Sequence, residues 1–182
     1  MTADDVLDFW FQGDPTVWRP CWFKRDDNFD AAIRARFADL VPTALAGQHD
    51  AWAATPAGAL ALVITLDQFP RNLYRATPRA FAADPRARTL AEAAIAASQD
   101  QALTPMQRVF LYLPFEHSED LADQDRSVAL FESLRMAEVA DYAHRHRDVI
   151  QRFGRFPHRN AALGRTSTPD ELAYLAEPGA GF

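Results

Sequence analysis

The sequence predicts an all-α protein: a single domain of antiparallel helix pairs over residues 1–182. Helix-start signals recur along the chain, and apolar residues between them follow helical spacing. No segment alternates apolar and polar residues over the length of a strand. The connections are short, which favours antiparallel neighbours, and a chain of 182 residues fits one domain. We expect residues 177–182 to be a frayed tail.

The first half of the chain contains the helix expected to be most buried. A short helix follows Thr2, and a second runs from about Asp26 into the forties, where Pro42 bends or divides it. Thr55 and Pro56 form a cap with proline at the first helical position. The helix from Ala59 to Leu66 is apolar on nearly every side, so it belongs at the centre of the domain.

The second half shows the same signals. Asp84 and Pro85 are expected to cap an alanine-rich helix that ends near Ser98. Thr104 and Gln107 form a capping box for a helix that stops at Pro114. Further helices are expected at 118–135 and 137–153, and a last short one after a second capping box at Thr168–Glu171.

Composition excludes several classes of protein. A net charge of −6 argues against a nucleic-acid partner and against an anionic membrane. The one cysteine, Cys21, excludes an internal disulfide and a cysteine metal cluster. The first ten residues lack a basic leader region, and the longest apolar stretch, Ala57–Leu66, is too short to cross a bilayer. We therefore expect a cytoplasmic protein, in which an anion site must use arginine because Lys24 is the only lysine.

The segment 67–75 is the first concentration of polar side chains, and it begins where the most buried helix ends. Pro70 disfavours helix at Phe69, so a turn is expected there. Buried polar groups must be paired or must line a pocket. The simpler interpretation is that Asp67 holds an arginine of this segment in an internal ion pair; in the alternative, Asp67 lines a pocket as a catalytic residue that orients a histidine. The candidate ligand-binding residues here are Arg71, Asn72 and Arg75.

The segment 114–124 is the second concentration. Acidic residues such as Glu119 and Asp120 are favoured near a helix N-terminus, which explains them without a function. That explanation does not extend to His117. The His-x-x-x-His spacing of a zinc protease helix is absent. His117 and Glu119 are therefore candidate catalytic residues.

The helix at 137–153 places His146 on its apolar face. A single inward-facing histidine is more often a hydrogen-bonded core residue than a ligand or catalyst. We therefore expect His146 to be a structural residue, and a catalytic role is the alternative.

The segment 151–165 contains four arginines and no acidic residue. In an acidic chain, this predicts an electropositive region that suits a small anion. A helix C-terminus capped by Gly154 accounts for Arg152 and Arg155. It does not account for the polar residues that follow. Among these, His158 is a candidate catalytic residue, and Arg159 and Asn160 are candidate ligand-binding residues, as is Arg155.

These phrases together resemble a family of uncharacterised bacterial proteins, the domain-of-unknown-function family 924, which has eukaryotic relatives. The resemblance rests on the phrases Leu66–Asn72, Pro114 with His117–Glu119, and Arg152–Asn160. It also rests on Leu7–Phe11, Trp22–Phe23, Phe81 with Asp84, and Leu163–Arg165. It implies an all-helical fold of the tetratricopeptide-like, right-handed superhelical kind and no particular reaction. The family often has an apolar residue before the histidine, where this chain has Glu116, which adds a carboxylate to the expected pocket.

Two functions remain open at this stage. The first is a small-molecule site that binds a carboxylate or phosphate, with His117, His146 or His158 as acid or base, oriented by Asp67, Glu119 or Asp120. Such a site suits a hydrolase or transferase without an organic cofactor; a metal enzyme through His117 and Glu119 ranks lower. The second is a protein-interaction module that clamps an acidic peptide in a helical groove. For the first function, we expect the three segments to converge on one concavity.

Overall fold

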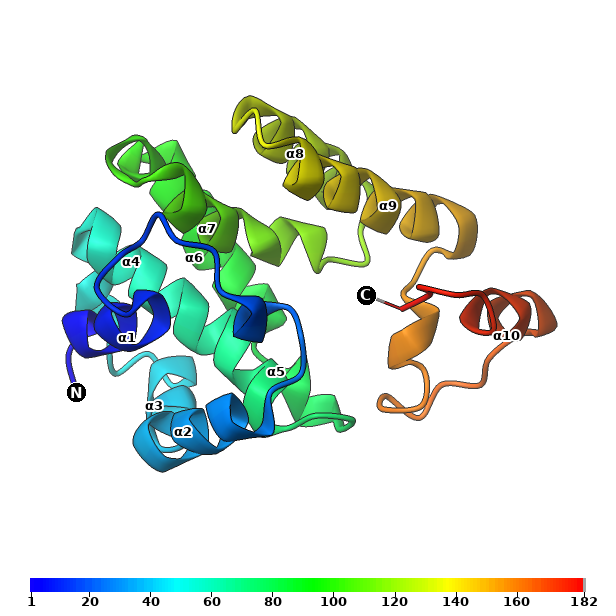
Figure 1. The fold of residues 1–182 in the computed structure, drawn as a ribbon, viewed down its shortest axis with the longest axis horizontal. Helices are drawn as coiled ribbons and strands as arrows, with labels where there is room; N and C mark the ends of the chain where they lie inside the picture. The colour runs from blue at the N-terminus through cyan, green and yellow to red at the C-terminus, as the bar shows by residue number, and fades with distance from the viewer. Residues whose placement is uncertain (182) are drawn as a thin grey trace. The chain divides into compact units, whose positions relative to one another are not determined.

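The computed structural model describes residues 1–181, and every regular element in that range is helical, as predicted (Figure 1). The α-helices are α1 (Ala3–Phe11), α2 (Asp27–Phe37), α3 (Leu40–Leu45), α4 (Pro56–Val63), α5 (Phe69–Leu73), α6 (Asp84–Ala96), α7 (Pro105–Glu116), α8 (Leu121–Ser133), α9 (Ala137–Phe153) and α10 (Pro169–Leu175). Short 3-10 turns lie at Pro20–Trp22, Asp50–Ala54, Pro78–Ala80, Gln99–Ala102 and Pro157–Arg159. A π-helical turn, Ile64–Gln68, joins α4 to α5.

The chain divides into two compact units. Unit 1 comprises Met1–Arg75 and Arg79–Pro114, and unit 2 comprises Ala76–Pro78 and the chain from Phe115 onward. That these units form the single domain expected from the sequence stays a prediction, as does the right-handed superhelix. The all-helical class is confirmed.

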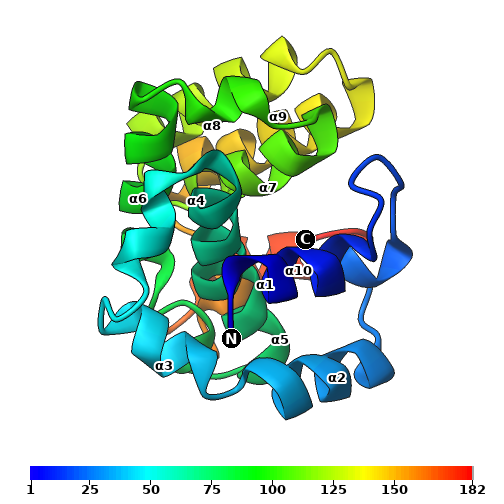
Figure 2. The ribbon, with the colours of Figure 1, turned by 90° about the vertical axis from the view of Figure 1, so that its left-hand side faces the viewer.

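Helix α4 is the centre of unit 1, where it packs against α1 and α6 (Figure 2). Its residues from Gly58 to Val63 are all buried, as its apolar sequence predicts. Thr55 caps the helix by accepting a hydrogen bond from the Gly58 N–H at 3.1 Å. A side chain at position 58 would place its Cβ 2.0 Å from the carbonyl oxygen of Trp52, so only glycine fits there.

The turn expected at Phe69 is absent, and this prediction was wrong. Pro70 has no N–H and crowds the preceding turn of an ordinary helix. The chain accommodates it by widening: the Phe69 N–H donates to the carbonyl of Ile64, five residues earlier. The chain therefore stays helical through Pro70, which lies in the first turn of α5 where a missing N–H costs little.

Other boundaries are partly as predicted. The long second helix is divided ahead of Pro42, and the capping boxes at Thr104 and Thr168 are both present. Two expectations were wrong. Helix α7 continues past Pro114 to Glu116, and Asp84 does not cap α6, because its carboxylate binds an arginine instead.

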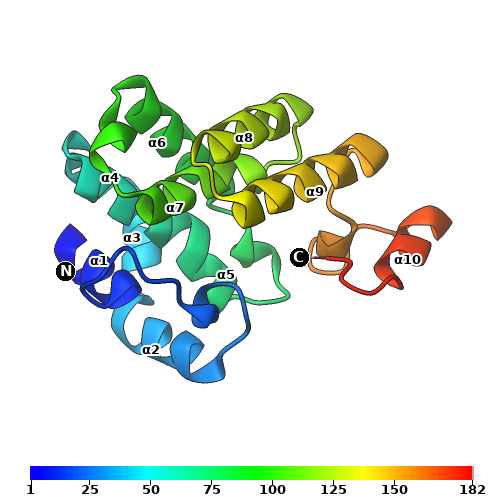
Figure 3. The ribbon, with the colours of Figure 1, turned by 45° about the horizontal axis from the view of Figure 1, so that its top comes forward.

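Unit 2 is built on α8 and α9, which lie side by side (Figure 3). Two cross-pairs fix their antiparallel direction: Arg147 Nε lies 2.9 Å from Asp125 Oδ1, and His144 Nε2 lies 2.9 Å from Glu132 Oε1. Helix α9 ends at Gly154, which takes the left-handed conformation with φ +68°. The following loop leads through the turn Pro157–Arg159 to α10.

The tail that we expect to be frayed lies beyond α10. Residues 177–181 form no helix, Phe182 lies outside the described residues, and fraying stays a prediction. Within residues 1–181, no helix is both long and apolar enough to cross a membrane.

Candidate functional site

In unit 1, the π-helical turn places Arg71 between two buried carboxylates. Its Nη1 and Nη2 donate to the two oxygens of Asp84 at 2.8 and 2.9 Å. Its Nη1 also lies 3.4 Å from Asp67 Oδ1 and donates to the Asp67 carbonyl at 2.6 Å. Burial alone lowers the pKa of Arg71, but the two carboxylates outweigh it, so the net shift is upward. The ion pair predicted between Asp67 and an arginine is thus present.

A second arginine of the same segment is also paired. Arg75 donates from Nε and Nη2 to the two oxygens of Asp30 at 2.6 and 2.8 Å. Asn72 donates to the same carboxylate at 2.7 Å. Burial raises the pKa of Asp30, whereas the hydrogen bonds from Arg75 and Asn72 lower it further than burial raises it. The polar side chains of this segment therefore bind α2 and α6 in unit 1.

Sequence reasoning missed both partner carboxylates. Asp30 lies on the apolar stripe of α2 that contains Phe29 and Ile33, and an acid among buried positions was the available signal. Asp84 was interpreted as a cap, a role that is common for aspartate before proline and that concealed its true partner.

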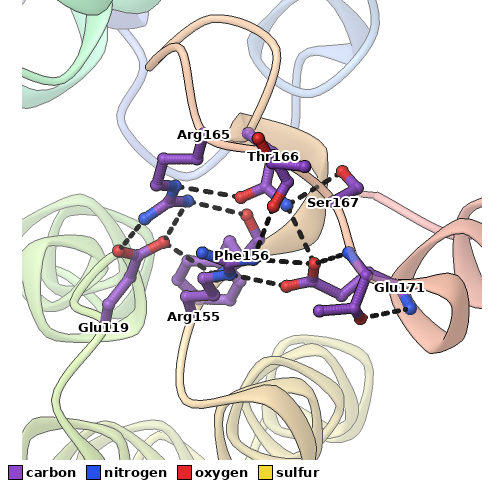
Figure 4. A network of polar contacts seen from close by, with 9 residues as sticks. Glu119, Arg155, Phe156, Arg165, Thr166, Ser167 and Glu171 are labelled. Carbon is purple, nitrogen blue, oxygen red and sulfur yellow. Dashed lines mark hydrogen bonds and ion pairs between the residues drawn. The ribbon is translucent and has the colours of Figure 1, made fainter.

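In unit 2, Glu119 and Arg165 form the first half of a polar network (Figure 4). Arg165 donates to the two oxygens of Glu119 at 2.7 and 2.9 Å. Glu119 also accepts the N–H of Phe156 at 2.7 Å, while Arg165 donates to the carbonyl of Phe156 at 3.1 Å. Both polar groups of the Phe156 backbone are thereby fixed.

Glu171 and Arg155 form the other half of the network (Figure 4). Arg155 donates to the two oxygens of Glu171 at 2.6 and 2.8 Å, and the N–H of Thr168 donates to the same carboxylate at 2.7 Å. The Arg155 guanidinium and the Thr168 N–H together lower the pKa of Glu171 to about 2. Asn160 joins the halves, because its amide donates to Glu171 at 3.2 Å and its Oδ1 accepts from Arg165 at 2.9 Å.

The network changes the interpretation of the arginine-rich segment. It contains no acid in sequence, but two of its arginines meet carboxylates contributed from outside it, Glu119 before α8 and Glu171 in α10. These pairs fold the loop 155–168 against the start of α8 and against α10. Glu119 therefore acts on this loop as a positioning residue in the structure.

The loop positioned in this way contributes His158 and Arg159 to a cluster of ionisable side chains, which we call the Phe156 cluster. His146 contacts the buried ring of Phe156 edge-on at 5.7 Å, and His158 lies at 5.5 Å on the ring centroids. The guanidinium of Arg159, a buried residue, lies 4.6 Å from the centre of the same ring. The cluster comprises Glu116, His117, His146, His158 and Arg159.

His146 occupies the most buried position among the three imidazoles. Burial lowers its pKa well below 6.5, and the nearby positive charges of His117, His158 and Arg159 lower it further, against a hydrogen bond with Tyr142 that raises it. Its Nδ1 lies 2.8 Å from the Tyr142 carbonyl oxygen and 3.5 Å from Glu116 Oε1. A carbonyl can only accept, so the hydrogen of the neutral ring is on Nδ1, and Nε2 presents a lone pair.

The structure assigns the predicted residues to two sets. Asp67, Arg71, Asn72 and Arg75 lie in unit 1; His117, Glu119, Arg155, His158, Arg159 and Asn160 lie in unit 2. Glu119, His158 and Arg159 contact Phe156, and Arg155 and Asn160 lie in its loop, while His117 interacts electrostatically with His146. Convergence of all three segments on one concavity stays a prediction. From the sequence, a structural role for His146 came before a catalytic one. Its neighbours in the fold, His158 and Arg159, lie far along the chain, so the sequence did not show that they surround it. In the described part of the chain, no group of three or more His, Cys, Asp or Glu side chains could hold a metal ion.

The fold and these clusters define an all-helical protein with buried arginine–carboxylate networks, and similarity to known proteins names its family. The model of the family described as bacterial proteins of unknown function (DUF924) matches residues 6–179. The chain belongs to this family. It is similar to the solved structure of a protein of unknown function from Agrobacterium tumefaciens, with 43% identity, 96% of each chain covered and a TM-score of 0.88. No curated protein matches the chain.

Proposed function

We propose that the Phe156 cluster binds a small anion, a carboxylate or a phosphate group. The observation that carries this proposal is the gathering of the buried Arg159 and two imidazoles, His146 and His158, around the Phe156 ring in a chain of net charge −6. A third imidazole, His117, interacts electrostatically with His146. Arginine stays charged at any working pH. Glu116 contributes one negative charge, so protonation of any imidazole makes the cluster net positive. In a low-dielectric setting, that charge attracts an anion strongly.

The same cluster supports a catalytic role, as a hydrolase or transferase that needs no organic cofactor. The Nε2 lone pair of His146 can accept a proton, and the burial that lowers its pKa keeps the imidazole neutral at neutral pH. His117 and His158 are the candidate acids. In this proposal Asp67, Arg71, Asn72 and Arg75 support the fold of unit 1, and Glu119, Arg155 and Asn160 hold the loop that carries Arg159.

A second candidate is the clamp for an acidic peptide in a tetratricopeptide-like superhelix. One observation favours it: an open groove of about 280 Å³ lies along α9, with Arg145 and Arg152 beside the aromatic rings of Phe153 and Tyr174. An open groove suits a peptide better than a small molecule. Asp148 and Glu177 also line the groove, and they reduce its attraction for an acidic chain.

One titration series separates the two functions. Sulfate and an acidic peptide are titrated calorimetrically into the wild-type protein, Arg159→Met and Arg152→Met. The small-anion site predicts that Arg159→Met weakens sulfate binding by about 1–3 kcal/mol, the worth of a charged hydrogen bond, while Arg152→Met leaves it unchanged. The peptide clamp predicts the reverse pattern for the peptide. Absence of sulfate binding to the wild-type protein would refute the small-anion site.

A further inference from the structure

The residues after α10 return to the Phe156 cluster. We call residues 177–181 the strap. An ideal Cβ built on Gly181 would lie 2.9 Å from the Cβ of His158, 3.5 Å from its Cγ and 3.9 Å from its Nδ1. The backbone at Gly181 therefore approaches the base of the His158 side chain, beside its imidazole, so closely that only glycine fits there without a shift.

The strap is lightly anchored. Its first residue is tied to α10, because the Glu177 N–H donates to the Tyr174 carbonyl at 3.0 Å. Beyond it, the described hydrogen bonds are the Ala180 N–H to the Glu177 carbonyl at 3.2 Å, within the strap, and Arg145 Nη2 to the Gly179 carbonyl at 3.4 Å. Glu177, Pro178 and Gly179 are exposed. A segment with few buried apolar contacts and exposed hydrogen bonds opens at a small cost in free energy.

We propose that the strap is a movable cover of the Phe156 cluster, which lies on His158 when closed and moves away to admit an anion. This inference rests on the proposed anion site. The contact with His158 is made by backbone at a glycine, so the closed strap fits closely while placing no side chain over the imidazole at that position. The closed strap therefore limits access to His158 but leaves the space beside the imidazole open for the anion.

The two strap glycines offer a matched pair of variants. Gly179 and Gly181 both have φ +78°, so alanine strains the backbone similarly at either position. At 181 the new Cβ meets His158, whereas at 179 it meets only Arg145 Nη2 at 3.9 Å, an ordinary contact. Gly181→Ala should therefore open the strap more than Gly179→Ala. Deletion of residues 177–182 removes the strap entirely.

The first measurement does not depend on anion binding. Acylation of His158 by diethyl pyrocarbonate is followed by peptide mass spectrometry in the wild-type protein, the two alanine variants and the deletion. We expect acylation to be several-fold faster in the deletion and in Gly181→Ala, and less accelerated in Gly179→Ala. Equal rates in all four proteins, each shown to be folded by circular dichroism, would overturn the proposal.

The second measurement tests the link to the anion site. The exchange rate of inorganic phosphate is followed by phosphorus NMR line broadening in the same proteins. Faster exchange in the deletion and in Gly181→Ala supports the cover. Phosphate binding with unchanged exchange would overturn the cover and leave the anion site standing. Accelerated acylation without phosphate binding to any of the proteins would support the strap contact and refute the anion site.

Discussion

Glu119 and Arg165 form a bidentate ion pair although they lie 46 positions apart in the chain. The pair encloses Phe156 between them, since Glu119 accepts its N–H and Arg165 donates to its carbonyl. Phe156 lies ahead of the short turn Pro157–Arg159, and a buried backbone N–H outside a helix needs such a partner. The pair thus determines where the residues that follow Phe156 lie, including His158 and Arg159.

Replacing Glu119 with Gln is expected to destabilise unit 2. Gln keeps one oxygen that can accept the Phe156 N–H. Its amide group, however, turns a donor toward the guanidinium of Arg165, so Arg165 loses a charged hydrogen bond. The free energy of unfolding should fall by about 1–3 kcal/mol, measured by urea denaturation.

An exposed ion pair supplies the control for this variant. Arg25 and Asp27 lie 2.8 Å apart with side chains 72% and 76% exposed. Asp27→Asn should change the free energy of unfolding by less than about 0.5 kcal/mol, because solvent screens such pairs. Equal effects of Glu119→Gln and Asp27→Asn would show that Glu119 does not hold the loop.

Unit 2 should lose stability in acid through Glu171. The folded-state pKa of this carboxyl is about 2, below its ordinary value of 4.5, because Arg155 and the Thr168 N–H bind the charged form. The sign follows directly: a depressed pKa contributes stability above pH 4.5 that is lost as the pH falls toward 2. Glu171→Gln should be less stable than the wild type at neutral pH, and its stability should fall less over that window.

Thermal unfolding between pH 6 and about pH 2 measures this difference, since linkage makes the slope of stability against pH report the protons taken up. Glu138→Gln, an exposed change in α9, is the control and should leave the slope as it is in the wild type. A wild-type slope in Glu171→Gln would mean that another carboxyl accounts for the acid sensitivity.

In unit 1, Arg71 should matter more than Arg75. Arg71→Met leaves the buried carboxylates of Asp67 and Asp84 without their shared cation, which typically costs about 3–5 kcal/mol when a buried pair is broken. Arg75 has a side chain 38% exposed, so water partly replaces it at Asp30 after Arg75→Met. Urea denaturation of both variants measures the order, and a larger loss for Arg75→Met would contradict it.

The sequence predicted the helices better than their partners, for a physical reason. Caps such as Thr104 and the apolar run of α4 are local signals, so they predict where a helix begins and which one is buried. The pairing of Arg75 with Asp30 joins residues 45 apart and leaves no local trace. The expected turn at Phe69 was wrong for another reason: the π-helical turn Ile64–Gln68, in which the Phe69 N–H donates to the Ile64 carbonyl five residues earlier, relieves a clash that a regular helix could not.

The candidate site shows the same division. The segment around Arg159 could be predicted because His158, Arg159 and Asn160 follow one another after the end of a helix, where such a run of polar residues is unusual. The place of His146 beside it depends on how the loop 155–168 folds back along α9, and periodicity shows only that His146 faces inward. The acid-free stretch of arginines predicted more exposed positive charge than exists, because Glu119 and Glu171 come from outside it.

His146 decides between a reactive and a structural role for the Phe156 cluster. Burial, then the positive charges around it, lowers its pKa well below 6.5, so NMR titration should show a neutral ring with its hydrogen on Nδ1 throughout the neutral range. His146→Gln can keep the hydrogen bond to the Tyr142 carbonyl through its amide, but it cannot take up a proton. If His146 is a base, this variant should stay folded, bind sulfate as before and lose turnover of any substrate found. The surface change His144→Gln, at the α8–α9 pair with Glu132, should alter none of these. A His146→Gln protein that unfolds at neutral pH would show instead that the imidazole is a core residue. A ring that charges near its ordinary pKa would contradict the lowered pKa of His146.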